Sequence, residues 1–462
     1  MKATQVSLGP TKASLAKERA TLVPEMLAAV GARYSRSNLG LEAILEKVSV
    51  QDQEQSIDAI FRFIDFGHAS VADMAPVAIF MDGVSMWLAY HLWALCPTAG
   101  GQESSTRYIR LSSDNLPDPN DLGIPPQLQG EWQSAINDAL GAYEKAGAFW
   151  ESYAAKHPEV LRIPASLLSN ESDKAQKAVT RMKRNYAFDR ARYFLPAALQ
   201  TNVMMVQSAR AWVGLCQQLL SHQLPEAQRL GALIREELAL VAPRLIKHAA
   251  PNDSWKAANQ RSFARLFERA NPVGEEWGWL LGEEDDEAFL NVWTNPADAA
   301  QFADDLKFHD NRYAFVGETL QATPLQFGWR AVALGDIRDL NRHRTGTKSC
   351  DLVPVGFYGA EDQASLNLPP VAIETGQKTS SRALELLAKE GQPFAFYWFL
   401  LGTQFGFSHT TTADKFIYEA ELRTGVGAHY RYAKHLRDAL GLWYQRFPAT
   451  RGLILEGSAE PE

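Results

Sequence analysis

Two clusters of polar residues in this chain have types and spacing that could bind a phosphorylated ligand. The first is Gln102-Glu103-Ser104-Ser105-Thr106-Arg107-Tyr108, which follows Gly100 and Gly101. Backbone N–H groups of a glycine-rich turn, hydroxyl groups and an arginine fork are the donors from which phosphate accepts hydrogen bonds. A helix N-cap with a local Glu–Arg pair is the plainer interpretation, and the residue types alone favour it.

The second cluster is Arg342-His343-Arg344, which ends two residues before Gly346. Successive helical residues point about 100° apart, so three such side chains could not share one wall from mid-helix. Glycine commonly ends a helix, which places the triplet in a last turn where side chains fan out. Cations that neutralise the helix dipole explain the triplet equally well.

Arg423 also stands where a predicted helix ends, before the turn Thr424-Gly425-Val426-Gly427. No third glycine follows and no strand precedes, which excludes a dinucleotide-binding fingerprint. The sequence also has no Walker, His-Glu-x-x-His or Gly-x-Ser-x-Gly motif, and nothing indicates a serine or cysteine nucleophile with a paired base. His68 and Ser70, taken alone, are typical of structural residues.

Helical periodicity dominates the elements that must position these residues. One apolar stripe, from Val84 to Leu95, leads to the first cluster, and another, from Ala331 to Leu340, leads to the triplet. Long helices are also expected over roughly 129–156, 203–222, 226–246 and 428–446, and a strand over 77–81. The same order of elements occurs twice, which predicts two related units in one chain.

These patterns predict a helix-rich α/β (α+β) fold built from two tandem units. The stretch 249–296 is rich in Asn, Pro and acidic residues, which is typical of a connection between domains. We therefore expect a first unit at 1–270, a connector at 271–295 and a second, more divergent unit at 296–462.

Length and composition restrict the class of protein. A chain of 462 residues suggests two or three domains, and 46% hydrophobic with 22% charged residues is ordinary for a soluble protein. A net charge of −8 argues against binding of a nucleic acid polymer. The longest apolar run, 394–401, is far shorter than the roughly 20 residues of a membrane helix. Three dispersed cysteines predict neither disulfides nor a metal site, so we expect a cytoplasmic protein.

Several segments, taken in order, resemble motifs of the flavin-dependent thymidylate synthases. The first half of the chain is similar to the family's His-x-Ser, Val-Ser, Glu-x-Ser-x-Arg-Tyr, Ala-Arg-x-x-Leu-Pro and Asn-Ala-Arg-x-Trp segments. The second half is similar to its Arg-His-Arg and Leu-Arg-x-x-x-x-Ala-Gln segments. The matching residues are Gly67-His68-Ala69-Ser70, Gly83-Val84-Ser85, Gln102 to Tyr108, Ala191-Arg192 to Pro196, Ser208 to Trp212, Arg342-His343-Arg344, and Leu422-Arg423 with Ala428-His429.

Each half departs from the family pattern where the other half keeps it. The first half has Ala94-Leu95-Cys96 in place of Arg-His-Arg, and His222 in place of the later arginine. The second half has Cys350 to Val355 in place of Glu-x-Ser-x-Arg-Tyr. Ser208 replaces an Asn and Asp339 replaces a Gln. The two halves therefore complement each other.

The resemblance implies a methyltransferase that reductively converts dUMP to dTMP, with methylenetetrahydrofolate as carbon donor and FAD, reduced by NADPH, as hydride carrier. By the same resemblance, Arg423 is the catalytic arginine and also contacts the substrate. The other expected substrate-binding residues are Gln102, Glu103, Ser105 and Arg107. The expected FAD-binding residues are His68, Ser70, Arg342, His343 and Arg344.

The resemblance also implies how the chain assembles. The family builds its sites between subunits, so a chain with two units is expected to form a homodimer that resembles a tetramer of units. Complementary departures predict two functional sites per dimer. Two alternatives stay open: related flavin- and folate-dependent chemistry on another pyrimidine nucleotide, and a non-catalytic relative that binds flavin or nucleotide.

Overall fold

The computed structural model describes residues 1–38, 40–50, 53–65, 69–107, 109–275, 287–363, 370–425 and 428–457. The chain forms two compact units that alternate along the sequence. Unit one comprises residues 1–104, 117–124 and 200–263, and unit two comprises 105–116, 125–199 and 264–462. The predicted boundaries at 270 and 296 separate two repeated segments of the sequence, whereas these two units are defined by their compactness. The predicted boundaries therefore stay a prediction.

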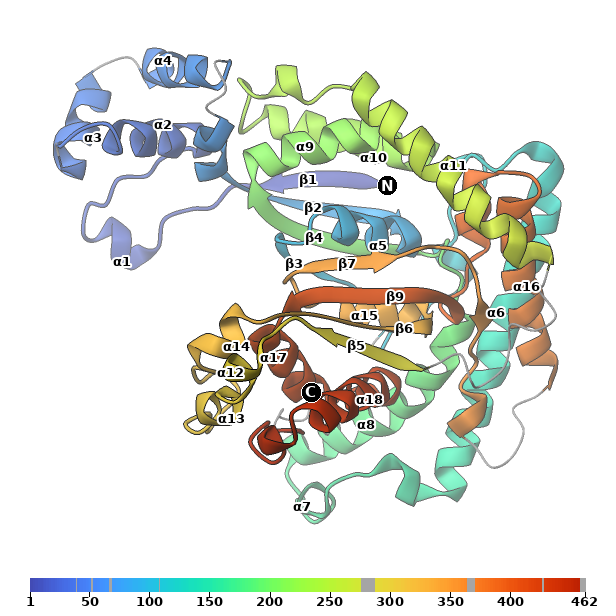
Figure 1. Cartoon of the computed structure of the whole chain (residues 1–462). Coiled ribbons are helices and arrows are strands. Elements are labelled where there is room, and N and C mark those ends of the chain that lie inside the picture. The colour runs from blue at the N-terminus through green and yellow to red at the C-terminus, as the bar shows by residue number, and fades with distance from the viewer. Residues whose placement is uncertain are drawn as a thin grey trace. The chain divides into compact units, whose positions relative to one another are not determined.

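Unit one is built on a four-stranded antiparallel sheet in the order β1-β2-β4-β3 (Figure 1). The strands are β1 (Lys2–Val6), β2 (Pro76–Ser85), β3 (Gly100–Glu103) and β4 (Gln200–Ser208). The helices are α1 (Lys12–Leu15), α2 (Pro24–Tyr34), α3 (Leu41–Val50), α4 (Gln53–Asp65), η1 (Ala69–Met74), α5 (Met86–Leu95), α9 (Ala209–Leu220), α10 (Pro225–Ala239) and η5 (Ile246–His248). Helix α10 packs against α9, β1 and β2.

Unit two has a sheet in the order β5-β6-β9-β7, with β8 also paired to β9. Its strands are β5 (Ala288–Val292), β6 (Pro324–Ala333), β7 (Thr347–Cys350), β8 (Gly356–Phe357) and β9 (Thr403–Thr412). The longer helices are α6 (Pro126–Lys156), α8 (Asp173–Ala191), α16 (Pro370–Ala388), α17 (Ala413–Arg423) and α18 (Tyr430–Arg446). Helix α11 (Asp253–Glu275) begins in unit one and ends in unit two.

The shorter helices of unit two connect these elements. They are η2 (Ser113–Asn115), η3 (Pro158–Leu161), α7 (Ala165–Leu168), η4 (Arg192–Phe194), α12 (Pro296–Ala299), α13 (Phe302–Asp305), α14 (Glu318–Ala322), α15 (Leu334–Leu340), η8 (Glu361–Gln363), η9 (Pro393–Trp398) and η10 (Pro448–Thr450). Helix α18 packs against β5 and β6, and α6 packs against α8 and α16. The predicted helix-rich α+β fold with two units is confirmed.

The two sheets share their topology in detail. In each, two long antiparallel strands are followed directly by helices, β2–α5 and β4–α9 in unit one, β6–α15 and β9–α17 in unit two. The register shifts near the end of the first long strand in both, between Asp82 and Val84 and between Trp329 and Val332. Gly100 of β3 pairs with Val206, and Thr347 of β7 pairs with Thr410, each two residues before its partner strand ends.

The strand-to-helix junctions differ from the predicted helices. The helix expected over 203–222 is strand β4 up to Ser208 and helix α9 only from Ala209. Short apolar runs do not distinguish a buried strand from a helix, and Val203 and Met205 are alternate buried residues of β4. The residue that marks the junction is Ser208, because its hydroxyl accepts from the N–H of Ala211 at 3.2 Å as an N-cap.

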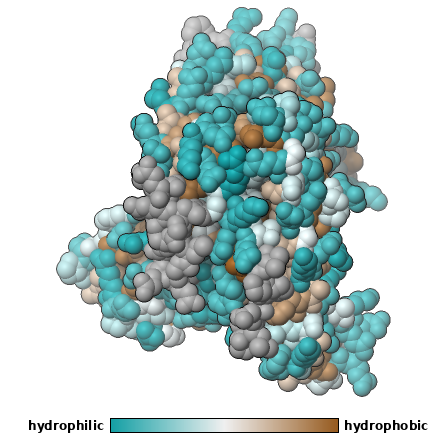
Figure 2. Space-filling view, turned by 90° about the vertical axis from the view of Figure 1, so that its right-hand side faces the viewer, coloured by the Kyte–Doolittle hydropathy of each residue, from teal (hydrophilic) through white to brown (hydrophobic). Residues whose placement is uncertain are grey.

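In each unit, a buried tryptophan connects two elements through a hydrogen bond from its indole N–H. In unit one, the indole N–H of the buried Trp212 donates to the carbonyl of Val77 at 3.0 Å, which fixes α9 on the sheet. In unit two, the indole N–H of Trp132 donates to the carbonyl of Tyr397 at 3.0 Å. On the face in Figure 2, hydrophilic residues predominate and hydrophobic residues occur in small groups. No helix in the described ranges is long and apolar enough to cross a membrane.

Candidate functional site

The predicted site residues are divided between the two units. Unit one contains Ser70, Gln102 and Glu103. Unit two contains Ser105, Arg107, Arg342, His343, Arg344 and Arg423. His68 lies outside the described residues. Six of the ten candidates, which come from three distant segments, therefore belong to one compact unit.

Gly100 and Gly101 form strand β3 with Gln102 and Glu103 rather than a phosphate-binding turn or a helix N-cap. Gly101 has φ of +151°, and a Cβ on it would lie 2.0 Å from the carbonyl oxygen of Met204. The glycine therefore allows β3 to approach β4 closely. The Glu103 carboxylate accepts from the indole N–H of Trp93 at 3.2 Å. Ser70 is exposed in η1.

Arg107 is held by a carboxylate that the sequence pattern did not reveal. Its Nε and Nη2 donate to the two carboxylate oxygens of Asp189 at 2.8 and 3.0 Å. Both side chains are buried, and Arg107 is only 6% exposed. Burial opposes both charges, but the pair outweighs it, lowering the pKa of Asp189 and raising that of Arg107. Ser105, in the same loop, accepts from the N–H of Arg107 at 3.2 Å.

The side chains of the three residues Arg342, His343 and Arg344, which follow α15, have different partners. His343 is buried, and its Nε2 accepts from Nε of Arg423 at 2.8 Å. Burial, supported by the charge of Arg423, lowers the pKa of His343 to about 3, so the ring is a neutral acceptor. Arg342 has a 38% exposed side chain and lies 3.6 Å from a carboxylate oxygen of Asp339. Arg344 is half-buried and donates to the carbonyl of Asn341.

Tyr432 of α18 lies beside Arg423 and within electrostatic range of Arg107. The Arg423 guanidinium lies 5.4 Å from the centre of the Tyr432 ring. Burial raises the pKa of the Tyr432 phenol, and the charges of Arg107 and Arg423 act against this rise. Both guanidinium groups are thus close enough to act on one buried phenol. Residues 316 positions apart (423 − 107) converge within unit two.

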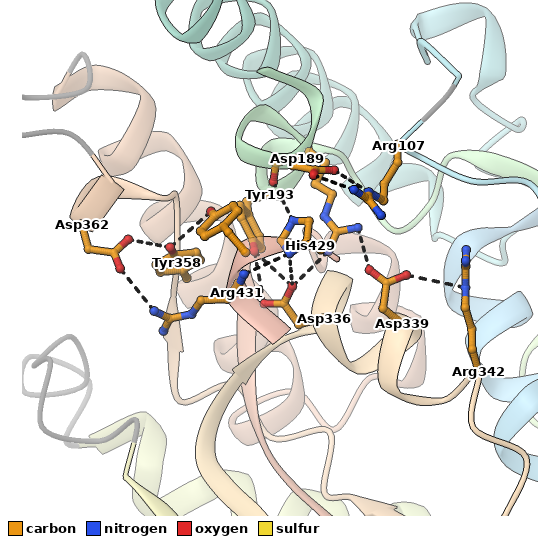
Figure 3. A network of polar contacts seen from close by, with 12 residues as sticks. Arg107, Asp189, Tyr193, Asp336, Asp339, Arg342, Tyr358, Asp362, His429 and Arg431 are labelled. Atoms are coloured by element: carbon orange, nitrogen blue, oxygen red, sulfur yellow. Dashed lines mark hydrogen bonds and ion pairs between the residues drawn. The ribbon is translucent and has the colours of Figure 1, made fainter. Parts of the chain in front are cut away.

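A buried ion-pair network continues from this point (Figure 3). Arg192 donates to Asp339 at 2.8 Å and to Asp336 at 3.0 Å, and all three side chains are buried. The Tyr193 hydroxyl donates to Asp336 at 3.1 Å. Burial raises the pKa of Asp336 to about 6 despite Arg192. For Asp339, the charges of Arg192 and Arg342 outweigh burial and lower the pKa.

His429 joins this network to the Arg107 pair. Its Nε2 lies 3.0 Å from the carbonyl oxygen of Asp189, and its Nδ1 lies 3.3 Å from the N–H of Arg431. The Nδ1 atom must accept there, so Nε2 carries the proton and donates to Asp189. Burial and then the charge of Arg192 lower the pKa of His429 to about 3, which agrees with a neutral ring. The side chains of Tyr358, Asp362 and Arg431 extend the network (Figure 3).

Sequence reasoning missed Asp189, Asp336 and Tyr432, but some of them carried a signal. Asp189 stands two residues before the matched segment Ala191-Arg192 to Pro196, and Asp336 stands three residues before Asp339. Residues three apart share a helical face, so Asp336 could have been placed beside Asp339, which the sequence had already singled out. Nothing in the sequence pointed to Tyr432.

The arrangement fits an anionic ligand. Arg342 and Arg344 offer cations at the end of α15 and could hold the diphosphate of FAD. His343 faces Arg423 instead, so its predicted contact with flavin stays a prediction. Among the described residues, no group of three or more His, Cys, Asp or Glu side chains could hold a metal ion.

The chain resembles known proteins in sequence. Residues 19–244 match a family model described as thymidylate synthase complementing protein. A UPF0159 protein of Chlamydia pneumoniae is 26% identical over 282 residues, which cover 55% of this chain and 50% of that protein. A UPF0159 protein of Chlamydia muridarum is 23% identical over 491 residues, which cover 94% of this chain and 90% of that protein. The match to the first of these relatives thus spans about half of its length.

A flavin-dependent thymidylate synthase of Mycobacterium sp. (strain KMS) is 26% identical over 184 residues, or 39% of this chain and 65% of that enzyme. A solved structure of a UMP/dUMP methylase from Streptomyces cacaoi, bound with 5-Br dUMP, aligns with a TM-score of 0.31 and 13% identity, covering 53% of this chain and 93% of that chain. The resemblance predicted from the motifs is confirmed.

Proposed function

We propose that this chain is a flavin-dependent enzyme that reductively methylates dUMP to dTMP. The family match over residues 19–244 supports the reaction class. The observation that carries the proposal is that Arg107 and Arg423, from distant segments, belong to one compact unit, where Arg423 contacts the Tyr432 ring and Arg107 acts electrostatically on the same phenol. Two cations from distant segments of one compact unit suit a ligand with a phosphate at one end and a polarisable ring at the other.

Arg423 is the catalytic residue of this proposal. Its guanidinium would hydrogen-bond to the uracil carbonyl as negative charge develops on the ring, because preorganised donors stabilise a transition state more than a ground state. His343 accepts from Nε of Arg423 and so fixes the direction of the guanidinium. When bound, FAD reduced by NADPH supplies the hydride, and methylenetetrahydrofolate supplies the carbon.

Arg107 would bind the nucleotide phosphate, with Ser105 beside it. Its Nε and Nη2 edge is occupied by Asp189, so a phosphate must either share the guanidinium or displace the carboxylate. The Asp189 backbone is held by His429, which would keep α8 in place during such an exchange. Arg342 and Arg344 would hold FAD. The roles of Gln102 and Glu103 at the substrate and of Ser70 at FAD, all three in unit one, stay predictions of the resemblance.

The proposal includes a homodimer of this chain. A homodimer would present four units, with two functional sites where both surviving sets of residues meet. The neighbourhood of Ala94-Leu95-Cys96 would lack the flavin-side cations, and that of Cys350 to Val355 would lack the phosphate-side arginine. Two FAD per dimer, in a cytoplasmic enzyme, is the expected stoichiometry.

A second candidate is the same chemistry on a cytosine nucleotide. Asp339 stands where the family resemblance expects a Gln, and its lowered pKa makes it an ionised group that only accepts hydrogen bonds. Asp339 also acts electrostatically on Tyr432, beside both arginines. An acceptor at this position would suit the amino group of cytosine better than the carbonyl of uracil.

The purified chain should show the visible absorption bands of oxidised flavin, alone or after addition of FAD. With NADPH and methylenetetrahydrofolate it should release tritium from C5-labelled dUMP, because methylation at C5 replaces that hydrogen. C5-labelled dCMP, assayed in parallel, tests the second candidate. Flavin bands without release from either nucleotide would favour a non-catalytic binding protein, and absence of flavin would contradict the proposal.

A further inference from the structure

The first half of α8 carries a groove that the proposed reaction does not use. Six exposed residues on one side of the helix line an open surface hollow of about 440 Å³: Asp173, Gln176, Lys177, Thr180, Arg181 and Arg184. Asp189, five residues after Arg184 on the same helix (189 − 184), belongs to the buried network instead.

Three cations dominate the groove. Lys177, Arg181 and Arg184 follow each other at spacings of four and three residues, which places them in one row on the helix. In the part of the chain that the structure describes, none of the three forms an ion pair, although Asp173 stands one turn before Lys177. The Arg184 guanidinium lies 5.8 Å from the centre of the Phe188 ring, a favourable contact that supplies no negatively charged partner.

Such a row is unfavourable without an anion. Neighbouring like charges on one helical face repel each other, whereas elsewhere in unit two Lys434 pairs with Asp438 at the same four-residue spacing. The excess of positive charge is also local, since the whole chain carries −8. The three cations stand in one row at the same surface hollow, which concentrates positive charge on this face of the helix.

We propose that this groove binds a small molecule that carries two or more phosphate or carboxylate groups. From Lys177 to Arg184 the helix rises by about 10 Å, so the cations suit anionic groups distributed along a ligand rather than one compact ion. The restriction of the hollow to one face of α8 and the net charge of −8 favour a small molecule over a nucleic acid strand. This site is independent of the dUMP-methylating activity.

The test is binding of inorganic tripolyphosphate and of citrate to the full chain by calorimetry at about 0.15 M salt, where long-range charge effects are screened. The groove variant is Lys177→Gln/Arg181→Gln/Arg184→Gln. The control variant, Lys145→Gln/Lys156→Gln/Lys183→Gln, removes the same charge from exposed residues of α6 and α8 outside the groove lining. The single variant Arg181→Gln carries the test if the triple groove variant does not fold.

Wild type and the control variant should bind at least one of the two probes with similar affinity. The groove variant should bind it roughly tenfold or more weakly, because charge-assisted hydrogen bonds are lost. Preference for tripolyphosphate or for citrate then identifies the ligand as a polyphosphate or a polycarboxylate. The proposal would be overturned if binding weakened equally in both variants or if neither probe bound. It would also be overturned if a single-stranded oligonucleotide bound more tightly than either probe.

Discussion

Replacing Arg192 with methionine should destabilise the protein by about 3–5 kcal/mol, the usual cost of breaking a buried ion pair from one side. Arg192 is the shared partner of Asp336 and Asp339, and its side chain is 2% exposed. Methionine keeps much of the length of the arginine but leaves two buried carboxylates without their cation. The loss is large because neither carboxylate can turn to solvent.

The urea unfolding midpoint of Arg192→Met, followed by tryptophan fluorescence, measures this cost. Lys434→Met is the matched control, since it removes a cation from an exposed pair with Asp438 and should cost about 0–1 kcal/mol. If the two variants had equal midpoints, the network around Arg192 would contribute no more than a surface pair.

Lowering the pH from 7 to 5 should destabilise the protein through its buried histidines. Burial lowers the pKa of His343, His429 and His222 to about 3 and that of His91 to about 4. These rings stay neutral in the folded state, whereas an unfolded histidine takes up a proton below about pH 6.5. The stabilisation is complete above that pH and decreases as the pH falls, by up to about 2 kcal/mol for each histidine at pH 5.

Asp336 acts in the opposite direction. Its folded pKa of about 6 lies above the usual value of 3.8, so protonation favours the folded state as the pH falls from 6 towards 4. Asp336→Asn should therefore make the loss of stability on acidification steeper.

Urea unfolding at several pH values tests the histidine effect. His429→Gln should flatten the dependence between pH 7 and 5, whereas His157→Gln, at a half-exposed position outside the core, should not. Identical slopes for wild type and His429→Gln would show that His429 does not resist protonation in the folded protein.

The elements that sequence predicted best are those with long periodic patterns. The helices expected over 129–156 and 428–446 agree closely with α6 and α18. The helix expected over 203–222 was wrong up to Ser208, because Val203 and Met205 suit either a strand or a helix and only pairing with β2 decides between them. The interleaving of the units depends on contacts between segments far apart in sequence, which local patterns do not contain.

The candidate site was also predictable only in part from the sequence. Motifs identified Arg107, Arg342, His343 and Arg423. They did not show which partners these side chains contact. Asp189 reaches Arg107 across 82 positions, and Arg423 reaches His343 across 80 positions. Tertiary folding sets such pairs, so a motif can name a residue without showing which charge it already binds.

The proposed function requires that Arg107 and Arg423 of one chain serve the same nucleotide. The direct test is the dUMP affinity and the turnover of each alanine variant. Arg107→Ala should weaken nucleotide binding by about 1.5–3 kcal/mol, the contribution of a charge-assisted hydrogen bond. Arg423→Ala should lower turnover by about 10²–10³, as loss of a transition-state donor does. Both variants should retain flavin, since Arg342 and Arg344 are unchanged. An equimolar mixture of the two should stay impaired, because both arginines act on Tyr432 within unit two. Wild-type behaviour of either variant, or activity restored by mixing, would contradict the claim.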